Sequence, residues 1–120
     1  MANKKFELEI FGTVYKECFF YLSKYLNGDL QISVFGIKDK TNITEHFLDI
    51  TVEQNSIELA KNHIVLDNYF KQELVEKLKQ LGVLKKYIGT FIIQSVRYPI
   101  YELDMENVKQ YTYETEGIAI

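Results

Sequence analysis

Alternation of apolar and polar residues along the chain predicts mostly β-strands. Phe6, Leu8 and Ile10 alternate with glutamates, which is typical of a strand with one buried face. Gly12 interrupts this pattern, and a similar alternation over residues 48–52 predicts a further strand. The sequence therefore indicates sheets with one face in the core and the other in water.

A β-hairpin is the clearest local prediction. Residues 19–26 form an apolar and aromatic run in which Leu26 shares a face with Phe20 and Leu22, and residues 30–34 alternate again. Asn27-Gly28 lies between the two runs, and both residues tolerate a positive φ. We expect two strands joined by a tight turn at this pair.

Two helices are predicted in the second half of the chain. Between residues 69 and 81 the apolar positions recur on one helical face, after Asp67-Asn68 as a possible cap and before Gly82 as a C-terminal cap. Asp104 can cap a short second helix over residues 105–111.

The remaining segments are less regular. Residues 57–66 are ambiguous: 64–66 favour a strand, whereas 57–61 could start as a helical turn. Residues 91–103 read as one β-rich run around Pro99. Since proline lacks an amide donor, we expect this strand at a sheet edge or kinked. The predicted class is α+β: a mainly antiparallel sheet, one principal helix (69–81) and a short C-terminal helix (105–111), in a single domain over residues 1–120.

Composition narrows the classes of function. A chain of 120 residues has the length of one domain, and its net charge of −3 argues against duplex nucleic acid and anionic membranes as partners. Cys18 is the only cysteine, so no intrachain disulfide can form. No apolar run approaches the roughly 20 residues needed to span a bilayer, and no secretion signal is evident. These features predict a cytoplasmic protein with no cofactor, and Cys18 as a buried structural thiol.

Arg97 is the most informative candidate for chemistry, because it is the only arginine in the chain. A guanidinium group holds phosphate or carboxylate through two parallel hydrogen bonds, and lysine cannot reproduce this geometry. Tyr98 and Tyr101 follow closely, so an anion-binding group lies beside rings that can stack on a base. An intrachain ion pair is the plainer interpretation of Arg97.

Asn68, Tyr69 and Phe70 form a second candidate group, at the start of the principal helix. Backbone amides at a helix N-terminus attract anions, and rings beside them can stack on a base. The plainer interpretation is a cap followed by a core phenylalanine.

No catalytic or metal site is evident. His46 and His63 are the only histidines and lie far apart in sequence, and no His or Cys spacing suits a metal ion. Asp67 could act as a base, although a helix cap explains it more simply. The glycines match neither a phosphate-binding loop nor a dinucleotide fingerprint.

Three segments together resemble a family of small proteins from phages and mobile elements whose characterised members are anti-Thoeris sponges. They are residues 25–32, residues 66–70 with the helix that ends at Leu81-Gly82, and residues 98–104, and the resemblance spans roughly 10–110. The chain departs from the family pattern after Asp67-Asn68, where other members often carry a second Asn and a Pro.

The resemblance implies a function and a site. Such proteins bind cyclic ADP-ribose isomers made by a TIR-domain sensor and sequester them without cleavage. They are homo-oligomers with the ligand near the subunit interface, and some also hold cyclic oligonucleotides at a second site. Position by position, Arg97 matches the phosphate-binding arginine, and Phe70 or Tyr69 matches the aromatic at the helix start.

Two other functions remain open at this point. An enzyme that degrades the same nucleotide would use His63 or Asp67 as a base. A protein-binding inhibitor of a host defence complex would use the acidic residues Glu7, Glu9 and Asp29.

Overall fold

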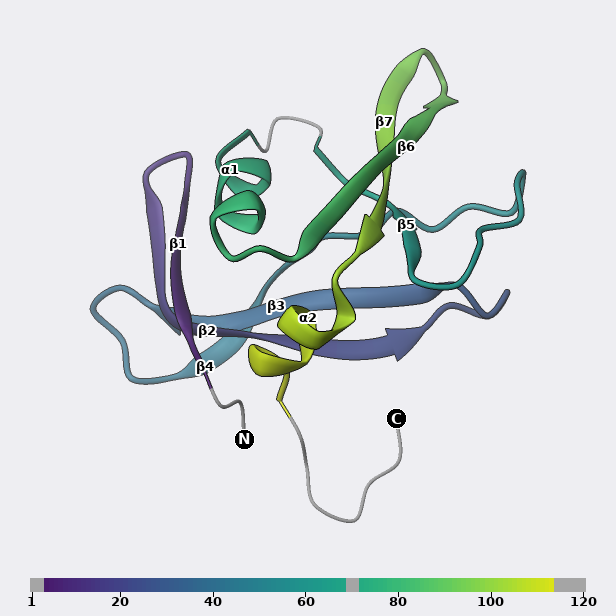
Figure 1. Ribbon diagram of the computed structural model, residues 1–120. Helices are drawn as coiled ribbons and strands as arrows, with labels where there is room; N and C mark the ends of the chain where they lie inside the picture. Colours follow the sequence, from purple (N-terminus) through teal and green to yellow (C-terminus); the bar gives the residue numbers. More distant parts are fainter. Residues whose placement is uncertain (1–3, 69–71, 114–120) are drawn as a thin grey trace.

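The computed structural model describes residues 4–68 and 72–113. Two antiparallel sheets and two short helices make up this part of the chain (Figure 1), which confirms the predicted α+β class. The four-stranded sheet carries the strands β1 to β4 in chain order, and the three-stranded sheet has the order β5-β7-β6.

The four-stranded sheet is built from consecutive antiparallel neighbours. Its strands are β1 (Phe6–Ile10), β2 (Thr13–Lys24), β3 (Leu30–Lys38) and β4 (Thr44–Asp49). Alternate residues of β1 are buried and exposed, as the sequence pattern predicts. β2 begins six residues earlier than the apolar run indicates, directly after the turn at Phe11-Gly12, where both residues have positive φ.

The predicted β2–β3 hairpin is confirmed, but its turn is longer than two residues. The amide of Tyr25 donates to the carbonyl of Asp29 at 2.9 Å, and that of Gly28 donates to Tyr25 at 2.9 Å. Only Gly28 has a positive φ, of 92°. This is a three-residue loop closed by a left-handed glycine. Leu26 lies at its tip, beyond the end of β2, and is fully exposed, so the prediction that it shares a strand face with Phe20 and Leu22 was wrong.

The three-stranded sheet corrects the prediction of one β-rich run over residues 91–103. β6 (Leu84–Ile93) and β7 (Val96–Leu103) form a hairpin, and β5 (His63–Val65) pairs with the other side of β7. The turn consists of Gln94 and Ser95, with φ of 47° and 68°. Two left-handed residues define a type I′ turn, for which Gln-Ser is an unusual sequence.

Pro99 lies in the central strand of this sheet, so its predicted edge position was wrong. Its carbonyl accepts a hydrogen bond of 2.9 Å from the amide of Leu66, the residue that follows β5. The nitrogen of Pro99 faces the same side of β7, where β5 has just ended. The missing donor therefore affects one position at the end of the β5–β7 ladder.

Both helices are present. α1 (Gln72–Gln80) ends at Gly82, which has a φ of 72°, and the amide of Val83 returns to the carbonyl of Leu78 at 3.2 Å. This bond closes the predicted glycine cap. The predicted start at residues 69–71 lies outside the described residues. α2 (Met105–Gln110) is capped by Asp104, whose carboxylate accepts from the amide of Asn107 at 3.2 Å.

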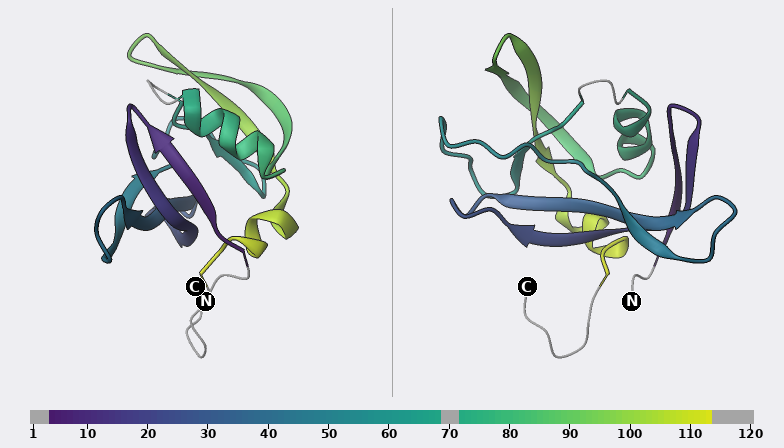
Figure 2. Two further views of the ribbon diagram at one scale, coloured as in Figure 1. Left: turned by 90° about the vertical axis from the view of Figure 1, so that its left-hand side faces the viewer. Right: turned by 180° about the vertical axis from the view of Figure 1, so that it is seen from behind.

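One apolar core joins these elements. α1 lies between the β1–β2 hairpin and the β6–β7 hairpin, above one face of the four-stranded sheet (Figures 1 and 2). Residues 57–61 form neither a helix nor a strand. The core consists chiefly of fully buried residues from both sheets and both helices: Leu8, Phe20, Ile32, Val34, Ile50, Ile64, Leu66, Leu74, Leu78 and Val108.

Candidate functional site

Arg97 and Tyr101 lie on the same face of β7. The register shifts between β6 and β7 insert their extra residues into β6, so side chains alternate regularly along β7. Arg97 is exposed, opposite the exposed Ile92 of β6. No described residue pairs with its guanidinium group, and the intrachain ion pair that would explain Arg97 more plainly is not formed within residues 4–68 and 72–113.

Asn68 follows the end of β5, which is aligned with the middle of β7. Val65 pairs with Ile100, and the bond from Leu66 to Pro99 continues this alignment by one position. The chain then turns at Asp67, because the amide of Asn68 donates to the carbonyl of Leu66 at 3.1 Å and the amide of Asp67 donates to that of Ile50 at 2.9 Å. Asn68 is half-buried. Tyr69 and Phe70 lie outside the described residues, so the structure places neither of these two candidates.

The two tyrosines of β7 lie on opposite faces. Tyr98 is half-buried on the face away from Arg97. Tyr101 packs against the core on one side, and its ring meets that of Tyr87 edge-on, with 5.8 Å between the centroids. Tyr87 is 54% exposed. The ring nearest to Arg97 on its own face of β7 is therefore Tyr101, with Tyr87 beside it as a ring that the sequence did not single out.

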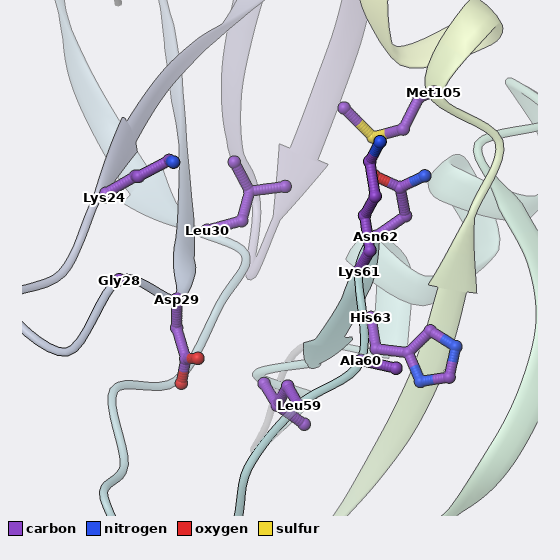
Figure 3. A pocket seen from close by; sticks show the side chains of 10 residues that line it. All are labelled: Lys24, Gly28, Asp29, Leu30, Leu59, Ala60, Lys61, Asn62, His63 and Met105. Carbon is purple, nitrogen blue, oxygen red and sulfur yellow. The ribbon is translucent and has the colours of Figure 1, made fainter.

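A pocket lies at the other end of β7. It has a volume of about 260 Å³ and is bounded by the β2–β3 hairpin on one side and residues 59–63 on the other, with Met105 at one end (Figure 3). Lys24 and Leu30 come from the hairpin, whereas Lys61 and His63 come from the facing segment. The chain reverses at Asn62, which has a φ of 65°.

This pocket combines cationic and polar groups that sequence reasoning did not join. Lys24 and Lys61 have no ion-pair partner among the described residues. Asp29 is the carboxylate of the lining, and its Oδ2 already accepts from Asn27 at 3.0 Å and Gln54 at 3.2 Å. The remaining lysines can attract an anion. No sequence pattern predicts that residues 24 and 61 are neighbours, because they come together only when the β2–β3 hairpin packs opposite residues 59–63.

The second histidine, His46, belongs to a polar cluster on the outer face of the four-stranded sheet. Ser33 donates to Asp49 Oδ1 at 2.6 Å, and His46 Nε2 lies 2.9 Å from the same oxygen. Partial burial acts to raise the pKa of Asp49, but the hydrogen bonds from Ser33 and His46 outweigh it and lower that pKa. Since both groups bond the carboxylate rather than each other, Ser33 is not arranged as a nucleophile activated by His46.

Aromatic rings account for much of the remaining outer face of this sheet. Phe19, Tyr21, Phe35 and Tyr113 line a shallow hollow of about 200 Å³. Their centroids lie 5.3 to 6.0 Å from their neighbours. The abundance of tyrosine and phenylalanine thus reflects a sheet surface as well as the core. This surface lies away from Arg97.

The cysteine and the acidic residues fall elsewhere. Cys18 is fully buried, and burial raises its pKa to about 12, which suits a structural thiol. Glu7 and Glu9 line a shallow groove with Glu73 and Glu76 of α1, whereas Asp29 lies in the pocket described above. The three acidic residues of the protein-inhibitor hypothesis therefore do not form one surface.

Three further findings concern metal binding, membrane-spanning helices and similarity to known proteins. Within residues 4–68 and 72–113, no three His, Cys, Asp or Glu side chains gather closely enough to hold a metal ion. The two described helices are too short to cross a bilayer. No family model, curated protein or solved structure matches this chain.

Proposed function

We propose that the protein binds and sequesters a cyclic ADP-ribose-type signalling nucleotide without cleaving it, and so blocks TIR-dependent Thoeris defence. The observation that carries the proposal is an exposed guanidinium group, that of Arg97, with no described partner of its own. Tyr101 and Tyr87 lie on the same face of this sheet as Arg97.

These groups suit the chemistry of such a ligand. The forked guanidinium of Arg97 would donate hydrogen bonds to two oxygens of the pyrophosphate. The amide of Asn68 would hydrogen-bond a ribose or base edge, and an exposed ring such as Tyr87 would stack on the purine. Sequestration needs binding energy and enclosure only, so no proton-transfer group is required.

The pocket of Lys24, Lys61 and His63 is the competing location for the same ligand. Lysines act as point charges towards phosphate, and a pocket of about 260 Å³ is close to the lower end of the range for small-ligand sites. Variants separate the two locations, because the pocket and Arg97 lie at opposite ends of β7.

The test is calorimetric titration with a cyclic ADP-ribose isomer. We expect Arg97→Ala to abolish detectable binding and Arg97→Lys to weaken it by at least tenfold, since lysine loses the bidentate geometry. Lys86→Ala removes a positive charge from the same hairpin and serves as the matched control, with affinity unchanged. Loss of binding in Lys61→Ala with retention in Arg97→Ala would move the site to the pocket. Absence of binding to every cyclic isomer by the unmodified protein would end the proposal.

Cleavage of the same nucleotide is the second candidate function, favoured by His63 at the pocket wall. Incubation of ligand with protein, followed by heat denaturation and mass spectrometry, separates the two functions. A sequestering protein returns the intact nucleotide, whereas an enzyme returns product that His63→Ala no longer forms.

A further inference from the structure

The outer edge of β6 carries backbone groups that face away from its own sheet. β6 is the edge strand of the β5-β7-β6 sheet, and no described residue pairs with its outer side. The β6–β7 hairpin projects from the body of the molecule, so this edge is accessible (Figure 1). An exposed edge of this length is a template for pairing with another strand.

The hydrogen bond at Pro99 identifies which amides face outward. Because the carbonyl of Pro99 accepts from Leu66 on the β5 side, Pro99 makes no ladder bond to β6. Its cross-strand partner Thr90 therefore directs its own N–H and C=O away from β7. Ile92, two residues further on, has the same orientation.

The side chains of this edge are uncharged. Residues 87–93 read Tyr-Ile-Gly-Thr-Phe-Ile-Ile, without charge or proline, and Tyr87, Ile88 and Ile92 are 54%, 42% and 59% exposed. A neutral, β-prone and exposed segment of seven residues has the composition of strands that associate. Lys85 and Lys86 border it at one end only.

We propose that β6 pairs antiparallel with β6 of a second copy of this chain, which joins two three-stranded sheets into one. Self-pairing suits this edge because residues 87–93 meet their own copies without like charges facing each other, and the two lysine pairs end at opposite ends of the joint. A two-fold axis makes the contact isologous and closed, so both edges are covered and no filament grows.

The pairing also bears on the ligand site. Ile92 is the cross-strand partner of Arg97, and neighbouring strands lie about 4.8 Å apart, so a second β6 would lie about 10 Å from the backbone of Arg97. The second copy would then contribute a wall to the surface around this guanidinium. The pairing itself does not depend on the proposed ligand.

Sedimentation equilibrium on the full chain tests the proposal. We expect twice the chain mass of 14.1 kDa for the unmodified protein. Thr90→Pro removes an outward amide without touching the β6–β7 ladder, and Ile92→Lys places a charge on each copy at the joint. Both are expected to shift the protein to monomer, with at least a tenfold increase in the dimer dissociation constant. Leu26→Lys, which changes an equally exposed leucine on the β2–β3 turn, is the control and should remain dimeric.

Hydrogen exchange gives a readout on the unmodified protein that does not depend on the variants folding. The amides of Thr90 and Ile92 should exchange slowly in concentrated protein and become faster on dilution, whereas the amide of Leu66, bonded within the monomer, should not respond. A monomer at all concentrations, a dimer that both variants leave intact, or exchange at Thr90 and Ile92 that ignores concentration would each overturn the proposal.

Discussion

At the scale of single residues, Gly36 of β3 is fixed by close packing rather than by backbone conformation. A Cβ at this position would lie 2.7 Å from Cys18 Sγ and 3.1 Å from the carbonyl oxygen of Lys16. Both neighbours belong to β2, and Cys18 is fully buried. The Cys18 side chain, together with the β2 backbone at its bulge, thus leaves too little room for a larger side chain at Gly36.

We predict that Gly36→Ala lowers the free energy of unfolding by about 1–3 kcal/mol through overpacking. Adding Cys18→Ala should recover part of the loss, because the sulfur is the nearer obstacle. Urea unfolding of the two single variants and the double variant gives the coupling. Gly89→Ala, where nothing lies within 4 Å of the new Cβ, is the control. Equal losses at Gly36 and Gly89 would contradict the packing argument.

Asp49 gives the fold a dependence on pH. Its pKa is lowered in the folded state because the hydrogen bonds from Ser33, His46 and Gln31 outweigh partial burial. The stabilisation is therefore present above the unfolded value, near pH 3.9, and is lost as the pH falls through the lower folded value.

We predict that Asp49→Asn destabilises the protein at pH 7 and that the difference from the unmodified chain narrows at pH 3. Urea midpoints at the two pH values are the measurement. Asp39→Asn removes an equal charge from an exposed ion pair with Lys16 at 3.8 Å and should have little effect. A difference at Asp49 that does not change with pH would show that its charge contributes nothing.

At the scale of elements, the β6–β7 turn joins two strands through residues poorly suited to it. Gln94 and Ser95 both have positive φ, a backbone conformation that is unfavourable for residues other than glycine, asparagine and aspartate. Replacing the pair by Asn-Gly should raise the free energy of unfolding by about 1 kcal/mol, because this pair favours the type I′ turn. Thermal unfolding measures the gain. Ser56→Gly, at a bend without positive φ, should give none, and a loss in the Asn-Gly variant would argue against the turn.

The secondary-structure elements differ in how far the sequence predicts them. The β2–β3 hairpin, Gly82 and the cap at Asp104 were predictable because each depends on a local preference with a known residue type. The hairpin over residues 84–103 was not, since Gln-Ser is no turn signal and Pro99 suggested an edge. The strand preference of residues 64–66 was confirmed by β5, but its partner β7 was not predictable, because this pairing joins residues far apart in sequence.

The candidate site shows the same division. Arg97 stood out from the sequence because it is a unique residue with specific chemistry. The contact of β5 with β7 comes from long-range pairing, and the pocket of Lys24 and Lys61 comes from the meeting of two segments distant in sequence. Neither contact has a local signal, because long-range pairing alone creates it.

At the scale of the whole molecule, residues 111–113, which follow α2, contact strands β1 and β2 near the start of the chain. The amide of Phe20 donates to the carbonyl of Tyr111 at 2.8 Å, and the amide of Tyr113 donates to Phe20 at 2.8 Å, so residues 111–113 extend the sheet beside β2. Thr112 is buried, and the ring of Tyr111 lies 5.8 Å from that of Phe6. The segment therefore ties α2 to the four-stranded sheet.

We predict that a chain ending at Gln110 has an unfolding free energy about 3–5 kcal/mol lower than a chain ending at Tyr113, the range for removing a large core aromatic. The difference should arise from two main-chain bonds and the ring of Tyr111. Urea unfolding followed by circular dichroism compares the two shortened chains with the full one. Tyr111→Phe in the full chain separates the contributions, since it retains the ring contacts and the backbone bonds and should cost little. If both shortened chains unfold at the same urea concentration, the sheet is complete without this segment, and α2 is held by the core contacts of Met105 and Val108 and by the hydrogen bond from Asn107 to Gly82.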